Sequence, residues 1–202
     1  MASTSEPDKK NIQLEGKVIA ITGANQEIGL GIADCCLSNG ASKVYSVDIG
    51  SPGNEFSNLQ LKYPDQFFSF QANVTKEESI SVDHILSETG AIHGMVCNAG
   101  RTKHMLALEF TTEEVEQLWG VNRGRSLNSA SMASYRPNKQ VPSAPYGASK
   151  AGARNMQLKY YGGIPRFAEV EELGGAYVYL LSDAASYTMG IDIPINGVIG
   201  IC

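Results

Sequence analysis

Short apolar runs alternate with amphipathic stretches along most of this chain. The run K-V-I-A-I-T at residues 17–22 is apolar and β-branched, which is typical of a parallel strand buried on both faces. Similar runs predict three further strands, at residues 43–47 (closed by Asp48), 66–72 and 94–97. The stretches between them predict helices at residues 30–39, 59–63, 77–88 and 112–122, with a turn at 23–29 and a loop at 50–58. This alternation predicts crossover connections and a parallel sheet.

The predicted fold class is therefore α/β, a doubly wound parallel sheet of the Rossmann-like, three-layer type. The 202 residues suffice for one domain with a sizeable core. We expect residues 1–13 to form a disordered tail, because the segment is mostly polar and charged, and residues 14–202 to form the single domain. In such sheets ligands bind at the carboxyl ends of the strands.

Composition excludes several classes of function. A net charge of −5 without a basic cluster argues against a nucleic-acid partner. No apolar run is long enough for a membrane span, and no signal peptide core is visible at the start, so we expect a cytoplasmic protein. The four cysteines show no metal-ligand spacing and are expected to be reduced thiols; no metal site is predicted.

Tyr146 and Lys150 are the most informative pair for chemistry. Four residues apart on a helix, their side chains share one face. An ammonium beside a phenol favours the phenolate, so Lys150 would lower the pKa of Tyr146 from its ordinary value. Such a tyrosine can exchange a proton with an alcohol or a carbonyl near neutral pH.

The segment T-G-A-N-Q-E-I-G at residues 22–29 lies between the first predicted strand and helix. Gly23 suits a tight turn and Gly29 suits close helix–strand packing, as a dinucleotide site requires. Asp48, at the end of the second strand, can accept hydrogen bonds from a ribose and repel a 2′-phosphate, which favours NAD over NADP. The alternative for Asp48 is a carboxylate that only caps its loop.

Four elements occur in a recognisable order: Thr22, Gly23 and Gly29; Asn98-Ala99-Gly100; the set Asn122, Ser131, Tyr146 and Lys150; and a tail with L-G-G-A at 173–176, L-S-D-A-A-S-Y at 181–187 and I-P-I-N-G at 193–197. Together they resemble the classical short-chain dehydrogenase/reductase family. The resemblance covers roughly residues 14–150 and 163–200. It is nearest to fungal members, which include sugar-alcohol dehydrogenases and tailoring enzymes of secondary metabolism.

The resemblance implies a nicotinamide-dependent oxidoreductase acting on an alcohol or ketone of a small molecule, with NAD(P) as cofactor. It implies that Tyr146 exchanges the proton, that Lys150 assists it and holds the nicotinamide ribose, that Ser131 bonds the reacting oxygen, and that Asn122 positions a relay water. The cofactor-binding set it implies is Gly23, Gln26, Ile28, Gly29, Asp48, Asn73, Asn98, Ala99, Gly100, Tyr146 and Lys150.

The chain departs from the family pattern in four places. Glu27 replaces the middle glycine of the turn, where a carboxylate would repel phosphate oxygens, so weaker cofactor affinity is expected. Asn73 replaces an aspartate near the adenine, a mild change. Only residues 123–130 separate Asn122 from Ser131, so the fifth strand is expected to be shortened. Past residue 156 the sixth strand and its Pro-Gly turn have no counterpart, so the sixth strand is expected to be missing.

The shortened regions change what can be expected of function and assembly. Relatives form homo-oligomers through helices that are truncated here, so impaired stability or altered assembly is expected. An alternative function is a catalytically impaired or non-redox protein on the same fold. It would act as a binding module, a partner subunit, or a cyclase or isomerase of the tailoring type.

Overall fold

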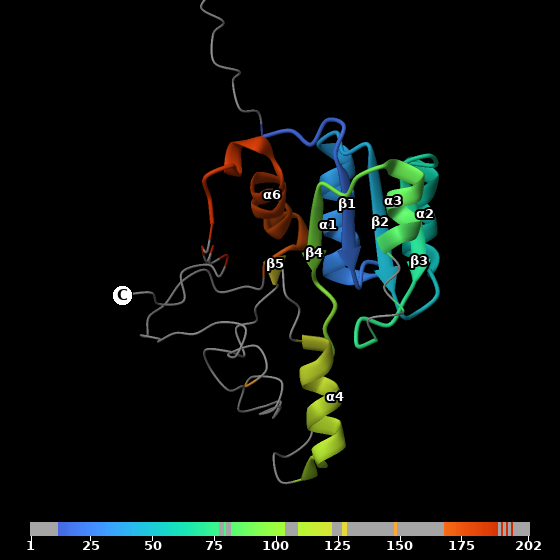
Figure 1. Cartoon of the computed structure of the whole chain (residues 1–202), viewed down its shortest axis with the longest axis vertical. Coiled ribbons are helices and arrows are strands. Elements are labelled where there is room, and N and C mark those ends of the chain that lie inside the picture. The colour runs from blue at the N-terminus through green and yellow to red at the C-terminus, as the bar shows by residue number, and fades with distance from the viewer. Residues whose placement is uncertain are drawn as a thin grey trace, which may run out of the picture.

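A computed structural model describes residues 12–76, 79, 82–103, 109–122, 127–128, 148, 168–189, 191, 193 and 195. Its centre is a parallel sheet in the order β3-β2-β1-β4-β5 (Figure 1). The strands are β1 (Val18–Thr22), β2 (Lys43–Asp48), β3 (Phe67–Gln71), β4 (Gly94–Cys97) and β5 (Leu127–Asn128). Strand order reverses between β1 and β4, and this switch point is where doubly wound sheets bind their ligands. The predicted fold class is confirmed.

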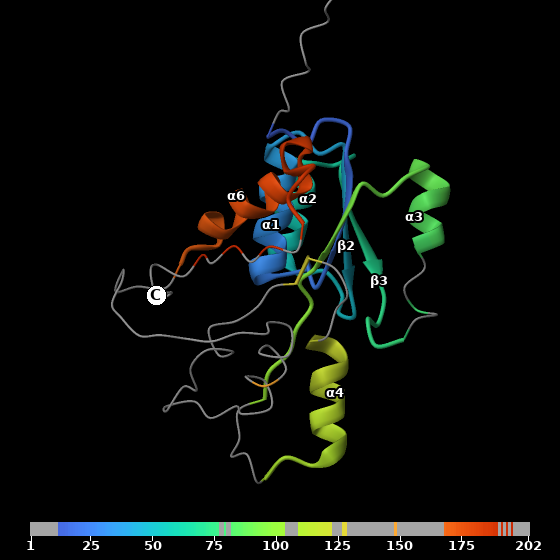
Figure 2. The ribbon, with the colours of Figure 1, turned by 60° about the vertical axis from the view of Figure 1, so that its left-hand side comes forward.

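Helices cover the sheet on both faces. They are α1 (Glu27–Ser38), α2 (Asn54–Lys62), α3 (Val82–Thr89), α4 (Thr112–Asn122) and α6 (Val170–Leu181), followed by the short 3-10 helix η4 (Asp183–Ala185). Figure 2 shows α1, α2 and α6 on one side of the sheet and α3 on the other, with α4 extending beyond the sheet's lower edge. The molecule is therefore three-layered, as the sequence predicts.

The main core lies between the sheet and the face covered by α1, α2 and α6. Alternate residues of β1, Ile19 and Ile21, point into it and are fully buried. Ile32 of α1 and Phe56 of α2 pack against the same cluster. Every residue of β1 is buried, and the strand is apolar from Val18 to Ile21, which explains why its sequence shows no polar alternation.

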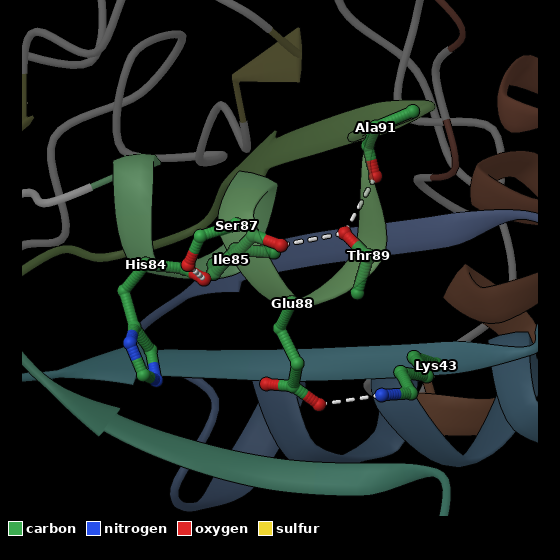
Figure 3. Close-up of polar contacts among 7 residues, drawn as sticks. All are labelled: Lys43, His84, Ile85, Ser87, Glu88, Thr89 and Ala91. Atoms are coloured by element: carbon green, nitrogen blue, oxygen red, sulfur yellow. Dashed lines mark hydrogen bonds and ion pairs between the residues drawn. The ribbon is translucent and has the colours of Figure 1, made fainter.

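The opposite face is smaller and carries the ion pair drawn in Figure 3. Val18, Ala20 and Tyr45 form a second cluster with Ile85 of α3. Figure 3 shows Glu88 of α3 reaching down to Lys43, and the Lys43 Nζ–Glu88 Oε1 distance is 2.5 Å. This contact lowers the pKa of Glu88 and raises that of Lys43. Lys43 is the first residue of β2, so this ion pair lies at the amino end of the sheet.

Helices α1 and α6, far apart in sequence, pack through glycines. A Cβ at Gly174 of α6 would overlap the Sγ of Cys35 on α1, and a Cβ at Gly31 of α1 would overlap Val170 of α6. A larger residue at either glycine would push the helices apart, because each neighbouring side chain occupies the space that the glycine leaves. The helix α6 begins with a capping box in which Glu169 and Glu172 satisfy each other's backbone N–H groups.

Several predicted boundaries were wrong. α1 begins at Glu27 rather than at Leu30, and α2 begins at Asn54, inside the predicted loop at 50–58. Gln26 and Gly53, the two N-caps, make no side-chain cap bond. The sequence signal for either start was therefore weak, because serine, threonine, aspartate or asparagine is the usual mark of an N-cap. α3 extends from Val82 to Thr89, while most of its predicted first turn, within residues 77–81, lies outside the described residues.

The carboxyl-terminal half of the sheet agrees with the expected shortening. β5 has two residues and pairs with β4 through Val96–Leu127 and Cys97–Asn128. No sixth strand occurs among the residues that the structure describes. The resemblance also implies a last strand at residues 191–195; its described residues, Ile191, Ile193 and Ile195, belong to no strand.

Candidate dinucleotide site

Three of the predicted site segments meet at the carboxyl edge of the sheet. Gly23 follows β1, Asp48 closes β2 and Asn98 follows β4. Since β2, β1 and β4 are neighbours in the sheet, their carboxyl ends are adjacent, at the lower edge in Figure 1. The structure thus brings together the turn, the acidic residue and the N-A-G segment that the sequence places far apart.

The turn after β1 is packed too closely to accept a side chain at either predicted glycine. Gly23 has φ +69°, and a Cβ there would lie 2.8 Å from the Cα of Ala99. A Cβ at Gly29 would overlap the carbonyl oxygen of Gly23 and lie 2.6 Å from Asn98 Nδ2. Both positions therefore require glycine, for the two reasons predicted from sequence.

Asn98 and Thr22 hold the turn against the end of β4. Asn98 Nδ2 donates to the carbonyl oxygens of Gly23 (2.9 Å) and Thr22 (3.2 Å). The backbone N–H of Ala99 donates to Thr22 Oγ1 at 3.0 Å. Asn98 therefore positions the glycine turn as well as bordering the site. Thr22 was predicted only as part of the turn motif, yet its hydroxyl links the end of β1 to the segment after β4.

Asp48 is bound by two backbone donors. Its Oδ1 accepts from the N–H of Gly50 at 3.0 Å, and its Oδ2 accepts from the N–H of Asn25 at 3.2 Å. These contacts correspond to the loop-capping alternative. They leave further lone pairs on each carboxylate oxygen, so capping is compatible with a ribose contact.

The first turn of α1 has the form of an anion site but carries a negative charge. The helix begins without a side-chain cap from Gln26, and its early N–H groups have no intrahelical acceptor. The side chains of Glu27 and Ile28 are both exposed at this end. Apart from Glu27, the residues present fit the pyrophosphate of a dinucleotide.

Glu27 adopts a backbone conformation that favours glycine. Its φ is +51°, the left-handed region, and no other non-glycine residue among the described residues has a positive φ. A glycine would adopt this conformation without strain. A negative side chain and a strained backbone coincide at the point nearest the expected phosphates.

Asn73 is engaged in its own turn. Its Oδ1 accepts from the N–H of Thr75 at 3.0 Å and from the hydroxyl of Thr75 at 2.8 Å. Its backbone N–H donates to Ser79 Oγ at 2.7 Å. The side chain therefore stabilises the turn that follows β3, whereas the resemblance implies a place beside the adenine.

The predicted catalytic residues lie almost wholly outside the described residues. Asn122 is the last residue of α4, and only its backbone is described. Ser131, Tyr146 and Lys150 are not among the described residues, and neither the side chain of Asn122 nor any of these three is placed by the structure. Ala148, between Tyr146 and Lys150 in sequence, is helical and exposed. Gly100, at the end of the N-A-G segment, is exposed at the same sheet edge.

The two thiols of α1, Cys35 and Cys36, offer no alternative chemistry. Burial raises the pKa of Cys36 to about 12. Burial and the neighbouring carboxylates Asp34 and Glu171 raise the pKa of Cys35. Both are therefore neutral near pH 7 and poor nucleophiles. Within the described part of the chain, no group of histidine, cysteine or acidic residues could hold a metal ion, and no helix has the length and apolarity of a membrane span.

Comparison with known proteins agrees with this geometry. Residues 17–124 match the family model for short chain dehydrogenase. The NADP-dependent mannitol dehydrogenase of Hypocrea jecorina is 25% identical, covering 91% of this chain and 92% of that protein. The 3-oxoacyl-[acyl-carrier-protein] reductase FabG of Aquifex aeolicus is 24% identical, covering 92% and 98%.

The alignment with the mannitol dehydrogenase also bears on length. It runs over 245 positions although this chain has 202 residues, so the relative carries residues for which this chain has no counterpart. This agrees with the expected truncation.

Solved structures show the same fold. The NADPH-dependent 3-quinuclidinone reductase of Rhodotorula rubra superimposes with a TM-score of 0.77 at 21% identity, over 98% of this chain and 97% of that one. The 3-ketoacyl-(acyl-carrier-protein) reductase of Brucella melitensis, solved with NADH, has a TM-score of 0.76 at 24% identity, covering 92% and 98%. The matched segment includes the glycine turn, Asp48, the N-A-G segment and α4, and the chain belongs to the short-chain dehydrogenase family.

Proposed function

We propose that this short-chain dehydrogenase transfers a hydride between a nicotinamide cofactor and an alcohol or ketone of a small molecule. The substrate class we infer is a sugar alcohol or a fungal secondary metabolite. The observation that carries the proposal is the packed turn at Gly23 and Gly29, which sits at the switch point of the sheet beside Asp48 and Asn98. A turn of this kind brings backbone N–H groups and a helix N-terminus to a diphosphate.

The chemical roles in this proposal fall on four residues. The nicotinamide, when bound, supplies or accepts the hydride. Tyr146 gives or takes the proton of the substrate oxygen, and Lys150 keeps the pKa of that phenol low. Ser131 hydrogen-bonds the same oxygen as charge develops on it, and Asn122 positions the water that relays the proton onward. The four-residue spacing of Tyr146 and Lys150, with helical Ala148 between them, supports this assignment.

Asp48 supports NAD as the preferred cofactor. A carboxylate at the end of β2 accepts hydrogen bonds from ribose hydroxyls and repels a 2′-phosphate. NADP is the alternative, because the mannitol dehydrogenase named above is NADP-dependent. We further propose a cytoplasmic location, which the unpaired thiols of Cys35, Cys36 and Cys97 support. The proposed partner is a small-molecule substrate, without nucleic-acid or membrane partners; relatives are usually homo-oligomers, and the truncated helices should alter that assembly here.

The decisive experiment is a fluorescence titration of the 202-residue protein with NADH and, separately, with NADPH. Saturable binding with a lower dissociation constant for NADH supports both the function and the cofactor preference. Tighter binding of NADPH supports the function and reverses the preference. Binding of neither by a folded sample contradicts the oxidoreductase function.

Turnover tests the catalytic assignment. Tyr146→Phe keeps the ring and removes the titrating hydroxyl, so alcohol oxidation followed by nicotinamide absorbance should be abolished. Tyr187→Phe, at a tyrosine that is 99% exposed, makes the same chemical change on the surface and should leave turnover unaltered. Full activity of Tyr146→Phe would exclude the proposed mechanism.

One observation favours a second candidate, a non-redox protein on this fold. Glu27 places a carboxylate and a strained backbone where the family has glycine. A protein that binds no nicotinamide nucleotide yet unfolds in a single cooperative transition would support a binding module or partner subunit. Substrate conversion without a change in nicotinamide absorbance would support a cyclase or isomerase.

A further inference from the structure

A buried hydrogen-bond network lies directly beneath Asp48. Ser46 Oγ donates to Asn25 Oδ1 at 2.7 Å, and Asn25 Nδ2 donates to the carbonyl oxygen of Gly50 at 2.7 Å. Ser46 is fully buried and Asn25 is 6% exposed. The three residues come from β2, from the glycine turn and from the loop after β2, so the network ties three segments together.

The same network holds both oxygens of the Asp48 carboxylate. The two backbone N–H groups that bind them belong to Asn25 and Gly50, which are the residues joined by the Asn25 side chain. The carbonyl oxygen of Asp48 also accepts from the N–H of Ala72, at 2.8 Å. Backbone and side chain of Asp48 are therefore fixed before any ligand arrives, and turning the carboxylate away would break two hydrogen bonds.

Buried polar networks of this kind select one arrangement, since every alternative leaves a buried donor or acceptor without a partner. Ser46 and Asn25 are poor choices for a core on hydrophobic grounds alone, because burying a polar group is unfavourable unless it is hydrogen-bonded. The burial of this hydrogen-bonded pair is explained if the pair holds Asp48 in place.

We propose that Asn25 and Ser46 are positioning residues that set the choice between NAD and NADP by holding Asp48 in one orientation. This inference rests on the proposed function and extends it to residues that do not themselves meet the cofactor. A fixed carboxylate discriminates against a 2′-phosphate because it cannot rotate away from the added charge. A carboxylate that is held less firmly can rotate away, so the preference for NAD over NADP should fall even though Asp48 is still present.

Two substitutions with a matched control test the proposal. Ser46→Ala removes the donor to Asn25 Oδ1, and Asn25→Ala removes the side chain that bonds Ser46 and Gly50 while keeping its own N–H. Ser69→Ala makes the same change at the residue paired with Ser46 on the neighbouring strand, where the side chain is exposed. The readout is the ratio of the NADPH and NADH dissociation constants, measured by fluorescence.

The expected result is a fall in that ratio by about 2- to 12-fold in Ser46→Ala and Asn25→Ala, the range for loss of one hydrogen bond, and no change in Ser69→Ala. Amide hydrogen exchange of the unliganded protein gives a second readout. The N–H groups of Asn25 and Gly50 should exchange faster in both variants relative to those of Ile19 and Ile21 in β1. A uniform loss of stability would accelerate all four together.

The outcomes separate this proposal from the function on which it rests. Binding of both nucleotides with an unchanged ratio in the two variants overturns the positioning role and leaves the oxidoreductase function standing. Unchanged exchange at Asn25 and Gly50 also overturns it. If the wild-type protein binds neither nucleotide, the function and the specificity role fail together, and the exchange data then show only whether the network holds the loop.

Discussion

Replacing Glu27 by glycine should improve both the stability of the fold and the affinity for a dinucleotide. Glu27 is the first residue of α1 and has φ +51°. The left-handed conformation costs an L-residue roughly 1–2 kcal/mol. Glycine removes that cost but loses about 0.5–1 kcal/mol more backbone entropy on folding. The expected net gain is about 0.5–1 kcal/mol, or a rise of roughly 1–4 °C in Tm for a chain of this size.

The effect on binding comes from charge. For an assumed separation of about 6 Å between the carboxylate and each of two phosphate charges, in a water-exposed setting with a dielectric constant near 80, Coulomb's law gives about 1.4 kcal/mol of repulsion. This corresponds to a dissociation constant about tenfold higher, that is, to weaker binding. The repulsion should fade in about 1 M salt, where the Debye length is about 3 Å.

Two variants separate strain from charge. Glu27→Gln removes the charge and keeps a side chain at the same φ, so it should tighten NADH binding about tenfold at low salt without raising Tm. Glu27→Gly should tighten NADH binding and also raise Tm. Titration calorimetry and thermal melts of the unliganded protein measure the two effects. The reasoning is refuted if Glu27→Gly leaves Tm unchanged and Glu27→Gln binds NADH no more tightly than wild type.

Three further predictions concern other parts of the molecule. Gly29→Ala should lower the free energy of unfolding, measured in urea, by about 1–3 kcal/mol, because the added Cβ would overlap the carbonyl oxygen of Gly23. Gly175→Ala is the control and should not destabilise the fold, because a Cβ there meets nothing within 4 Å. The lowered pKa of Glu88 means that its ion pair with Lys43 stabilises the fold above the unfolded pKa of the carboxyl. That contribution is lost as pH falls through the folded pKa, so Glu88→Gln should flatten the acid limb of a Tm-versus-pH curve, and an unchanged limb would contradict this. Cys36 should resist iodoacetamide at pH 8 in the folded protein and react after unfolding, as followed by mass spectrometry; labelling of the native protein would contradict its burial.

Much of the nucleotide-binding half could be predicted from the sequence because local and global signals coincide there. β1 is apolar from Val18 to Ile21 and is followed by two glycines, so the strand, the turn and the helix can be predicted from the sequence alone. The turn's need for glycine at Gly23 and Gly29 was also visible, since both follow from spacing within a known motif.

What could not be predicted depends on contacts between segments distant in sequence. Asn25 and Ser46 look like an ordinary turn residue and an ordinary strand residue, and their pairing depends on how β2 lies beside the turn. The start of α2 at Asn54 was missed because Gly53 supplies no side-chain cap. A positive φ is unexpected for glutamate, so the backbone conformation of Glu27 could be found only from the structure.

The glycine-mediated contact between α1 and α6 has a consequence for how this fold tolerates change. Because Gly31 faces Val170 and Gly174 faces Cys35, the helix that opens at the nucleotide turn is backed by a helix from near the other end of the chain. Both helices of this contact lie outside the stretch between β5 and α6. The nucleotide turn and the tail of the chain are therefore coupled: a substitution that separates α6 from α1 should also shift the helix whose first turn faces the dinucleotide site.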